Sequence, residues 1–193
     1  EKQGIRALNE DTDLSKSTVV IRAHGITPKR RQELEASGAE ISDATCPRVK
    51  RVQSIIEENA NEGYSTIIVG DEGHAEVTGL LGYTDGKGYV VSSPDEVSKL
   101  PDMEKICIVA QTTQDMNTFA LIAEKLKHRY KNHKVFDTIC SSTSRRQEEV
   151  ISLSKEVDAM IVVGGRGSAN TNRLVEISEK KGVPAFLVET EHE

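Results

Sequence analysis

The sequence has no tryptophan, and aromatic residues make up only 4% of its 193 residues. Long apolar runs are also lacking, since none approaches the roughly 20 residues that a membrane-spanning helix needs. The first residues, EKQGIRALNEDTD, have neither the basic start nor the apolar centre of a secretion signal. We therefore expect a cytoplasmic protein that has no contact with a membrane.

Cysteine is scarce, and basic residues are outnumbered by acidic ones. The three cysteines, Cys46, Cys107 and Cys140, are odd in number and far apart, unlike the disulfide framework of a small secreted domain. The 25 lysines and arginines stand against 31 aspartates and glutamates, for a net charge of −6. No basic stripe is formed, so we expect no nucleic-acid partner. In a reducing cytoplasm the thiols need another role.

Short β-branched apolar runs alternate with amphipathic stretches along the whole chain. Such runs, bounded by glycine or polar turns, are typical of buried parallel strands, and the alternation indicates an α/β fold whose sheets are covered on both faces. The expected strands are 18–23, 65–70, 105–110, 159–164 and 184–189, with weaker candidates at 88–91 and 134–136. The expected helices are 47–62, 119–130, 143–157 and 172–181.

The number of strands does not suit one sheet, and two cysteines mark natural divisions. Cys46 and Cys140 both stand at corners between a strand and a helix. We expect three small α/β units, at residues 1–45, 46–139 and 140–193. The first and last units are expected to be incomplete, because the chain looks like a piece of a longer protein.

The positions of Cys46 and Cys140 suit metal binding. Each lies at the start of an expected helix, where backbone amides and the helix dipole favour the thiolate that a metal requires. The alternative is a pair of small buried hydrophobic residues, because no Cys-x-x-Cys motif is present. Cys107 differs from both, since it lies inside the apolar run KICIVA and is expected in the core.

Two histidines and a carboxylate occupy expected loops that follow strands, which is where ligands bind in open α/β sheets. His24 lies in AHG, and His74 and Glu76 lie in GHAEVTG. An imidazole can bind an anion while a carboxyl carries a proton. The alternative is that both are turn histidines whose ring nitrogens are satisfied by the backbone.

A glycine-rich loop, GGRGSANTN at 164–172, precedes another expected helix. Free amides at a helix N-terminus, with the side chains of Ser168 and Asn170 beside them, would suit a phosphate group. A plain tight turn is the alternative, since the spacing of a Walker A loop is absent. Thr112 and Thr143 would add hydroxyl donors, unless they serve as N-caps.

Six motifs in this order resemble the 4-hydroxy-3-methylbut-2-enyl diphosphate reductases, also called the LytB family. They are AHG, DATCP, GHAEVTG, QTT, IC-x-x-T-x-x-RQ and VVGG-x-x-SANTNRL. The resemblance implies a trefoil of three α/β units around a [4Fe-4S] cluster that three cysteines hold, with one iron open. It also implies reduction of an allylic alcohol diphosphate to isopentenyl and dimethylallyl diphosphate, the last step of the methylerythritol phosphate route to isoprenoids. A small ferredoxin or flavodoxin would donate the electrons.

The resemblance also implies roles for individual residues. Cys46 and Cys140 match two cluster ligands, and Glu76 matches the proton relay. The matches to substrate-binding groups are His24, His74, Ser168 and Asn170 at the diphosphate, with Thr112 and Thr143 nearby in the pocket. The family's first cysteine, another phosphate-binding histidine and a further serine fall outside this sequence, and Ala169 stands where some members have serine.

Two alternatives to a reductase remain at this point. A metal-dependent hydrolase of a phosphorylated metabolite would use His24, His74 and Glu76, and its cysteines would belong to the core. The chain would otherwise be an inactive fragment that folds without doing chemistry.

Overall fold

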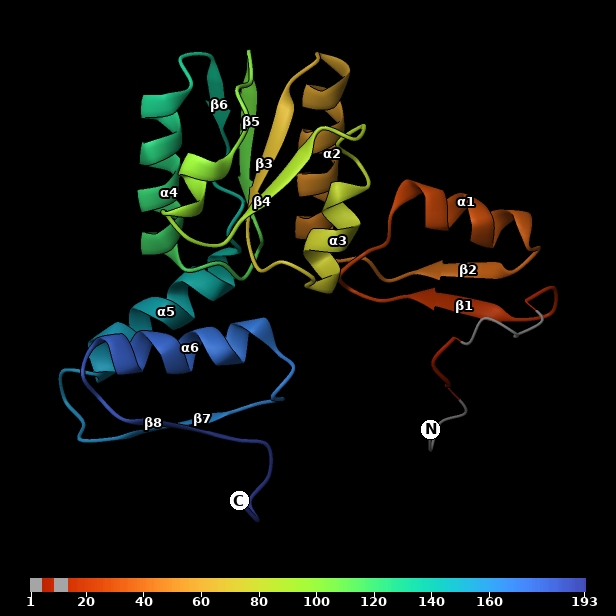
Figure 1. The fold of residues 1–193 in the computed structure, drawn as a ribbon. Coiled ribbons are helices and arrows are strands. Elements are labelled where there is room, and N and C mark those ends of the chain that lie inside the picture. The colour runs from red at the N-terminus through yellow and green to blue at the C-terminus, as the bar shows by residue number, and fades with distance from the viewer. Residues whose placement is uncertain (1–4, 9–13) are drawn as a thin grey trace.

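The computed structural model describes residues 5–8 and 14–193. Figure 1 shows three α/β lobes, with the largest in the middle of the chain. All strand pairs in the described residues are parallel, and they form one sheet of four strands and two sheets of two. The α/β fold with parallel sheets is therefore confirmed. The unit boundaries at residues 46 and 140 stay a prediction.

The central sheet has the order β4-β3-β5-β6. Its strands are β3 (Ser65–Val69), β4 (Gly88–Val91), β5 (Ile106–Ala110) and β6 (His133–Val135). Helices α2 (Pro47–Asn61) and α3 (Ala75–Leu81) lie on one side, and α4 (Met116–Arg129) lies on the other with the short 3-10 helix η1 (Glu96–Lys99). Every residue of β5 is buried, as is expected of a central parallel strand.

The two faces of this sheet build two separate cores. Because successive side chains of a strand point to opposite faces, Ile67 packs against α4 while Ile68 packs against α2. In β5, Ile108 likewise packs on the α4 side of the sheet, and Cys107 packs on the α2 side. Each fully buried Ile, Leu or Phe contributes about 1.5–3 kcal/mol relative to its exposed state. The expected apolar faces of the helices at 47–62 and 119–130 are thus confirmed.

The smaller lobes each contain a two-stranded sheet. The first has β1 (Thr18–Ile21), α1 (Pro28–Ala36) and β2 (Glu40–Asp43). The last has α5 (Ser141–Leu153), β7 (Met160–Val163), α6 (Ala169–Lys180) and β8 (Ala185–Val188). Val20, Ile161, Val163 and Phe186 are more than half exposed. The expectation of sheets covered on both faces is therefore wrong for these lobes within the described residues.

Besides the short 3-10 helix η1, three elements of the structure are absent from the expected list: β2, α1 and α3. Strand β2 has a single apolar residue in EISD, and α1 buries only Leu34, so neither shows a periodic pattern. Helix α3 occupies most of the segment that we expected to be a loop at 73–79. The expected helical face of α5 is partly wrong, since Leu153 is 49% exposed.

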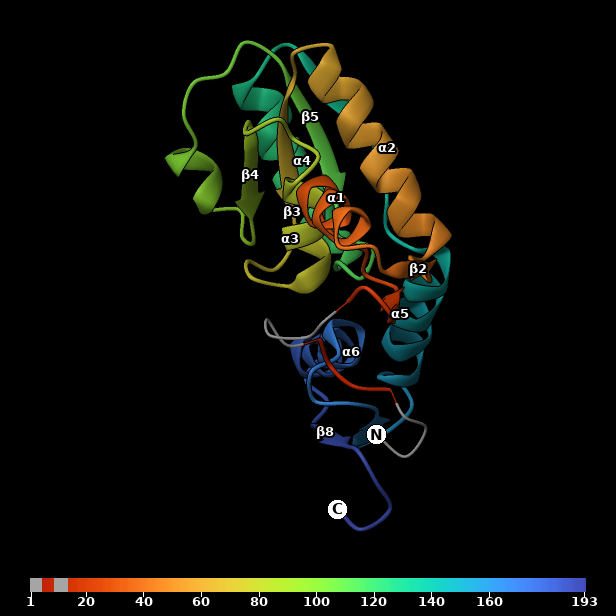
Figure 2. The same ribbon diagram turned by 90° about the vertical axis from the view of Figure 1, so that its right-hand side faces the viewer.

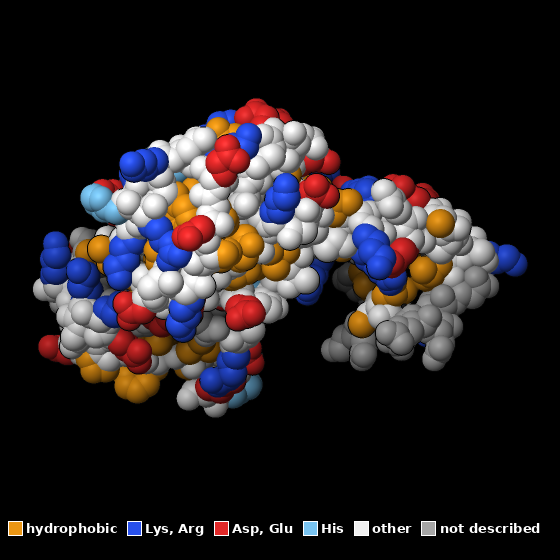
Figure 3. Space-filling view, turned by 45° about the horizontal axis from the view of Figure 1, so that its top comes forward, with side chains coloured by type: hydrophobic (Ala, Val, Ile, Leu, Met, Phe, Trp, Pro, Cys, Tyr) orange, Lys and Arg blue, Asp and Glu red, His pale blue; other side chains and the backbone are white. Residues whose placement is uncertain are grey.

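Charged side chains of both signs are interspersed over the face shown in Figure 3. Within the described residues, none of the helices combines the length and the hydrophobicity that crossing a bilayer requires.

Candidate functional site

Loops from the three lobes meet at the carboxyl ends of the central strands. The amide of Cys46 donates a hydrogen bond to the carbonyl of Ala23 (3.0 Å), which joins the start of α2 to the AHG loop. The amide of Cys140 donates to the carbonyl of Thr112 (2.9 Å), which joins the start of α5 to the QTT loop. This is the edge of a parallel sheet at which ligands bind.

Cys46 and Cys140 are the N-cap residues of α2 and α5, as their sequence positions indicate. Neither thiol caps its helix, so both sulfur atoms remain free to bind a metal. The pKa of Cys140 is lowered by a hydrogen bond with the Ser142 hydroxyl (Sγ to Oγ 3.1 Å), and further by helix amides and the charge of Arg48. Figure 2 shows the start of α2 beside the start of α5, so the two helix starts are close neighbours.

Cys107 has no part in this site. Its side chain is completely buried in the core between the central sheet and α2. Burial raises the pKa of its thiol to about 12. The expectation that Cys107 is a core residue is confirmed.

His24 and His74 lie together. Their rings meet edge to face with centroids 5.2 Å apart. Burial lowers the pKa of His24, and the charges of Arg22 and His74 lower it further, while Glu76 opposes the shift. The Nδ1 atom of His24 is buried without a hydrogen-bond partner in the protein. The alternative of a turn histidine satisfied by the backbone therefore does not hold for that atom.

His74 is the N-cap of α3, which explains why a helix starts inside the expected loop. Its Nδ1 accepts a hydrogen bond from the amide of Glu76 (3.2 Å). A ring nitrogen that accepts carries no proton, so the proton of a neutral ring resides on Nε2. The cap therefore fixes the tautomer, and Nε2 is left as the donor that an anion needs.

Glu76 is buried in the first turn of α3, with 2% of its surface exposed. Its Oε1 accepts from the amide of Thr112 and its Oε2 accepts from the hydroxyl of Thr112, both at 2.7 Å. The carbonyl of the same threonine accepts from the amide of Cys140. A short chain of bonds thus connects the carboxyl group to the backbone of a candidate metal ligand, away from bulk water.

The remaining predicted residues lie around this centre. Thr143 is buried in the first turn of α5, three residues after Cys140. Ser168 is the N-cap of α6, where its Oγ accepts from the amide of Thr171 (3.3 Å). The segment 169–172, which we expected in a loop, is helical, so Asn170 belongs to the first turn of α6. The Oδ1 of Asn170 is buried without a partner in the protein.

A pocket of about 420 Å³ lies between the His74 loop and the start of α6. Its lining includes His74, Gly167 and Ala169. The amides at the start of α6 and the ring of His74 thus lie at one open cavity, an arrangement that suits an anion.

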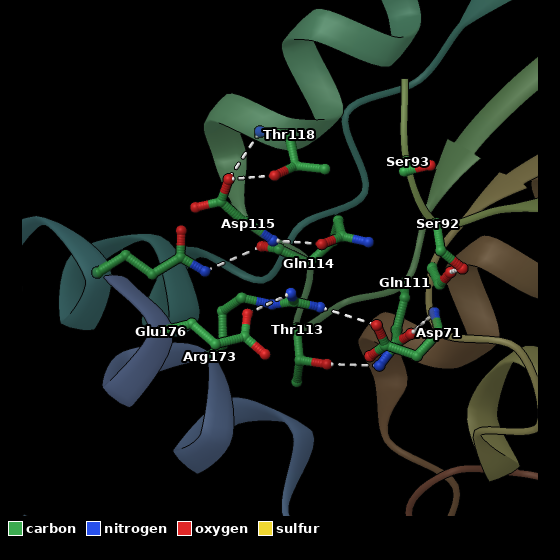
Figure 4. A network of polar contacts seen from close by, with 12 residues as sticks. Asp71, Ser92, Ser93, Gln111, Thr113, Gln114, Asp115, Thr118, Arg173 and Glu176 are labelled. Atoms are coloured by element: carbon green, nitrogen blue, oxygen red, sulfur yellow. Dashed lines mark hydrogen bonds and ion pairs between the residues drawn. The ribbon is translucent and has the colours of Figure 1, made fainter. Parts of the chain in front are cut away.

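Polar residues that the sequence analysis did not select connect the last lobe to the central one. Arg173 of α6 contacts Asp71, which follows β3, and buried Gln111 supports Asp71 (Figure 4). Gln111 and Arg173 lie within the motifs QTT and VVGG-x-x-SANTNRL, but a motif does not reveal contacts with partners that are far away in the sequence. Asp71 could have been suggested only by its place in the loop that follows β3, at the edge of the sheet where ligands bind.

The thiols fit part of a ligand set for an iron–sulfur cluster. Cys46 and Cys140 are free and stand at neighbouring helix starts, and the low pKa of Cys140 favours the thiolate. Within residues 5–8 and 14–193 there is no group of three or more Cys, His, Asp or Glu side chains that could hold a metal ion. The described residues therefore offer two candidate thiols and no third group beside them.

The family model described as LytB protein matches residues 1–193. A curated protein of Opitutus terrae, named 4-hydroxy-3-methylbut-2-enyl diphosphate reductase, is 40% identical over 185 residues, which are 95% of this chain and 64% of that protein. One of the same name from Caldanaerobacter subterraneus is 43% identical over 193 residues, 98% of this chain and 67% of that protein. The chain thus spans about two thirds of the length of these relatives.

Solved structures resemble the whole chain as well. The E-1-hydroxy-2-methyl-but-2-enyl-4-diphosphate reductase from Plasmodium falciparum has a TM-score of 0.90 at 33% identity, over 98% of this chain and 60% of that one. A second structure, of (E)-4-hydroxy-3-methyl-but-2-enyl diphosphate reductase, has a TM-score of 0.69 at 39% identity, over 97% of this chain and 67% of that one. Both likenesses confirm the fold that the sequence motifs led us to expect.

Proposed function

Since the chain belongs to the LytB protein family, we propose that it serves in the reductive removal of the hydroxyl group of 4-hydroxy-3-methylbut-2-enyl diphosphate. The products would be isopentenyl and dimethylallyl diphosphate, at the end of the methylerythritol phosphate route. The observation that carries the proposal is the buried Glu76 carboxyl, which Thr112 joins to the start of α5 at Cys140.

Cys46 and Cys140 would be two of the ligands of a [4Fe-4S] cluster. When bound, such a cluster supplies electrons one at a time and an iron with an open position that acts as a Lewis acid toward a hydroxyl oxygen. What this chain contributes is a pair of thiols at helix N-termini, of which Cys140 has a lowered pKa that favours its thiolate. A small ferredoxin or flavodoxin would be the source of the electrons.

The diphosphate would lie in the pocket between the His74 loop and α6. Nε2 of His74 is available as a donor, and a bound phosphate would give the unpartnered Nδ1 of His24 an acceptor. The first amides of α6 and the hydroxyl of Ser168 would contact the other phosphate oxygens. Because Oδ1 of Asn170 is only an acceptor, the amide nitrogen of Asn170 would be the group that faces the anion.

The reaction consumes two electrons and two protons, since an alcohol and two hydrogens become an alkene product and water. One of the protons must reach the departing hydroxyl oxygen. We assign the delivery of this proton to Glu76, whose Oε2 accepts a hydrogen bond from the hydroxyl of Thr112. The buried setting keeps bulk water from competing for this transfer.

The hydrolase alternative is not favoured. Among the described residues, no group of three or more His, Cys, Asp or Glu side chains is arranged to hold a metal, and His74 Nδ1 already accepts a hydrogen bond from the amide of Glu76. A cytoplasmic location, without a membrane or nucleic-acid partner, is part of the proposal.

Anaerobic reconstitution of the full-length protein with iron and sulfide tests the function. We expect a brown protein with cluster absorbance that reduces the allylic diphosphate when a reduced ferredoxin or flavodoxin is supplied. Cys46→Ser and Cys140→Ser should each lose iron and turnover, whereas Cys107→Ala, in the core, should keep the cluster band. A protein that is active without iron, or a Cys46→Ser variant with full activity, would reject the proposal.

A further inference from the structure

An ion pair joins two segments that are 102 residues apart. The Nη2 atom of Arg173 in α6 lies 2.9 Å from Oδ1 of Asp71, which follows β3 (Figure 4). Among the ion pairs in the described part of the chain, it is the one that links the lobe of α6 to the central lobe. It therefore spans a joint between lobes, unlike a pair within one helix.

The arginine is held firmly. Its side chain is only 12% exposed, and its Nη1 makes a second pair with Glu176 of the same helix at 2.8 Å. Two carboxylates on one guanidinium, in a partly buried place, form a more persistent contact than a surface ion pair. The positive charge of Arg173 is already balanced, so it is poorly placed to be the main attraction for an anion.

The aspartate is part of the turn that carries His74. The amide of His74 donates to the carbonyl of Asp71 at 3.1 Å. The amide of Asp71 donates to Oε1 of Gln111 at 2.8 Å, and the side-chain amide of that buried glutamine donates to the Thr113 hydroxyl at 2.9 Å. The turn that carries His74 is thus bonded to the central sheet through Gln111 and to α6 through Arg173.

The same residues line the pocket. Asp71 and His74 form one wall, while Gly167, Ala169 and Arg173 form the other, around about 420 Å³. The far side of the last lobe has its own anchor, since buried Gln147 of α5 bonds the carbonyl of Gln114 at 2.9 Å. Of these two contacts between the lobes, the ion pair of Arg173 and Asp71 is the one that lies at the pocket.

We infer that Arg173 and Asp71 are positioning residues that set the distance between His74 and the N-terminus of α6, and that diphosphate affinity depends on this pair. The inference rests on the proposed function. An anion site loses affinity when one of its two halves moves away, because each lost hydrogen bond to a charged group weakens binding by roughly tenfold or more.

Two variants, each of which neutralises one carboxylate, distinguish this positioning role from a simple effect of charge. Asp71→Asn and Glu176→Gln each remove one negative charge from the same guanidinium, but only the first breaks the link between lobes. Electrostatics alone predicts that both variants bind diphosphate at least as tightly as the parent. The positioning role predicts that Asp71→Asn binds roughly tenfold or more weakly, whereas Glu176→Gln does not.

The measurement is calorimetric titration of the cluster-loaded, full-length protein with inorganic diphosphate, together with steady-state kinetics. For Asp71→Asn, KM should rise more than kcat falls. Arg173→Gln should match it, and Asp71→Asn with Arg173→Gln should be no worse than the weaker single variant. Thermal unfolding of each variant shows that it is folded, and if Asp71→Asn is not, Asp71→Ser, which also removes one negative charge, takes its place in the comparison with Glu176→Gln.

The inference is overturned if Asp71→Asn and Arg173→Gln bind inorganic diphosphate as tightly as the parent, or if their effects simply add. That failure differs from the failure of the proposed function. In the latter case, the parent protein itself would neither bind diphosphate nor turn over the allylic substrate.

Discussion

A substitution of Glu76 should lower the turnover rate and leave diphosphate binding nearly unchanged. Glu76→Gln keeps the size of the side chain and can still accept from Thr112, but it cannot supply a proton. Since a positioned acid or base contributes about 10²–10⁴-fold to rate, we expect kcat to fall by that order while the affinity for the diphosphate changes little. Single-turnover reduction of the allylic diphosphate, with inorganic diphosphate binding measured beside it, checks this.

Glu76→Asp is the matched variant, because it keeps the carboxyl group on a shorter stem. It should recover part of the lost rate. If Glu76→Gln turned over at the parental rate, the carboxyl would have no part in proton transfer and its burial would be structural only.

The thiols should differ in reactivity when no cluster is bound. Hydrogen bonding with Ser142 lowers the pKa of Cys140, while burial raises the pKa of Cys107 to about 12. A lower pKa leaves more thiolate at a given pH, and the thiolate is the nucleophile. We expect iodoacetamide to modify Cys140 in the folded protein and to reach Cys107 only after unfolding. Peptide mass spectrometry over a pH series measures both, and early labelling of Cys107 would contradict the burial argument.

At the residue scale, the types and chain positions of the candidate site residues could be predicted, but their contacts could not. Cys46 and Cys140 follow from helix-start positions. The bond from Thr112 to Glu76 joins residues 36 positions apart, and no periodicity or spacing encodes it. The contact of Arg173 with Asp71 could not be predicted for the same reason, although Arg173 lies in the motif VVGG-x-x-SANTNRL.

The corner between β2 and α2, which presents Cys46, depends on one aspartate. Asp43 accepts from the amide and hydroxyl of Thr45 at 3.0 and 2.5 Å, and it pairs with Lys50 at 3.1 Å and with Arg31. Burial alone would raise the pKa of Asp43, but the bonds from Thr45, Lys50 and Arg31 outweigh it and hold that pKa well below its ordinary value of 3.8.

A depressed pKa in the folded state sets the sign of the pH dependence. The stabilisation by Asp43 is fully present above its unfolded pKa, and it is lost as the pH falls below about that value. Asp43→Asn should therefore cost about 1.5–3 kcal/mol at pH 7 and progressively less as the pH drops below 3.8. Urea unfolding at a series of pH values measures this. Equal losses at neutral and acidic pH would contradict the assignment.

At the element scale, helices with a strong apolar periodicity could be predicted from the sequence, whereas short helices and strands without one could not. Helices α2 and α4 bury regular apolar faces, and both were expected close to their observed bounds. Helix α3 was missed because its cap is a histidine, which is not among the preferred N-cap residues. Strand β2 is recognisable only from its pairing with β1, a contact between residues far apart in the sequence.

At the scale of the whole molecule, the three sheets differ in how well they are covered. Strands β3 and β5 have helices on both sides, whereas β7 and β8 form a two-stranded sheet with Ile161, Val163 and Phe186 exposed. The sequence predicted all of these runs as buried, because β-branched composition alone does not distinguish a covered face from an open one. The packing partner of a face is a property of the tertiary structure.

Amide hydrogen exchange should show this difference directly. Two-stranded sheets with an open face have little apolar surface to protect them, so their hydrogen bonds open at a lower free energy than those of the central sheet. We expect amides of β7 and β8 to exchange at least about tenfold faster than those of β3 and β5, equivalent to about 1.4 kcal/mol. Those of β1 and β2 should resemble β7 and β8.

The same experiment tests the division of the chain into units at residues 1–45, 46–139 and 140–193. If the units open separately, amides within each should share one opening free energy, and urea should lower the three values independently. Asp71→Asn, which cuts the ion pair between α6 and the central lobe, should then speed exchange in α6 and leave β3 and β5 unchanged. A single opening free energy throughout residues 14–193 would mean that the lobes unfold together, and the proposed division would be wrong.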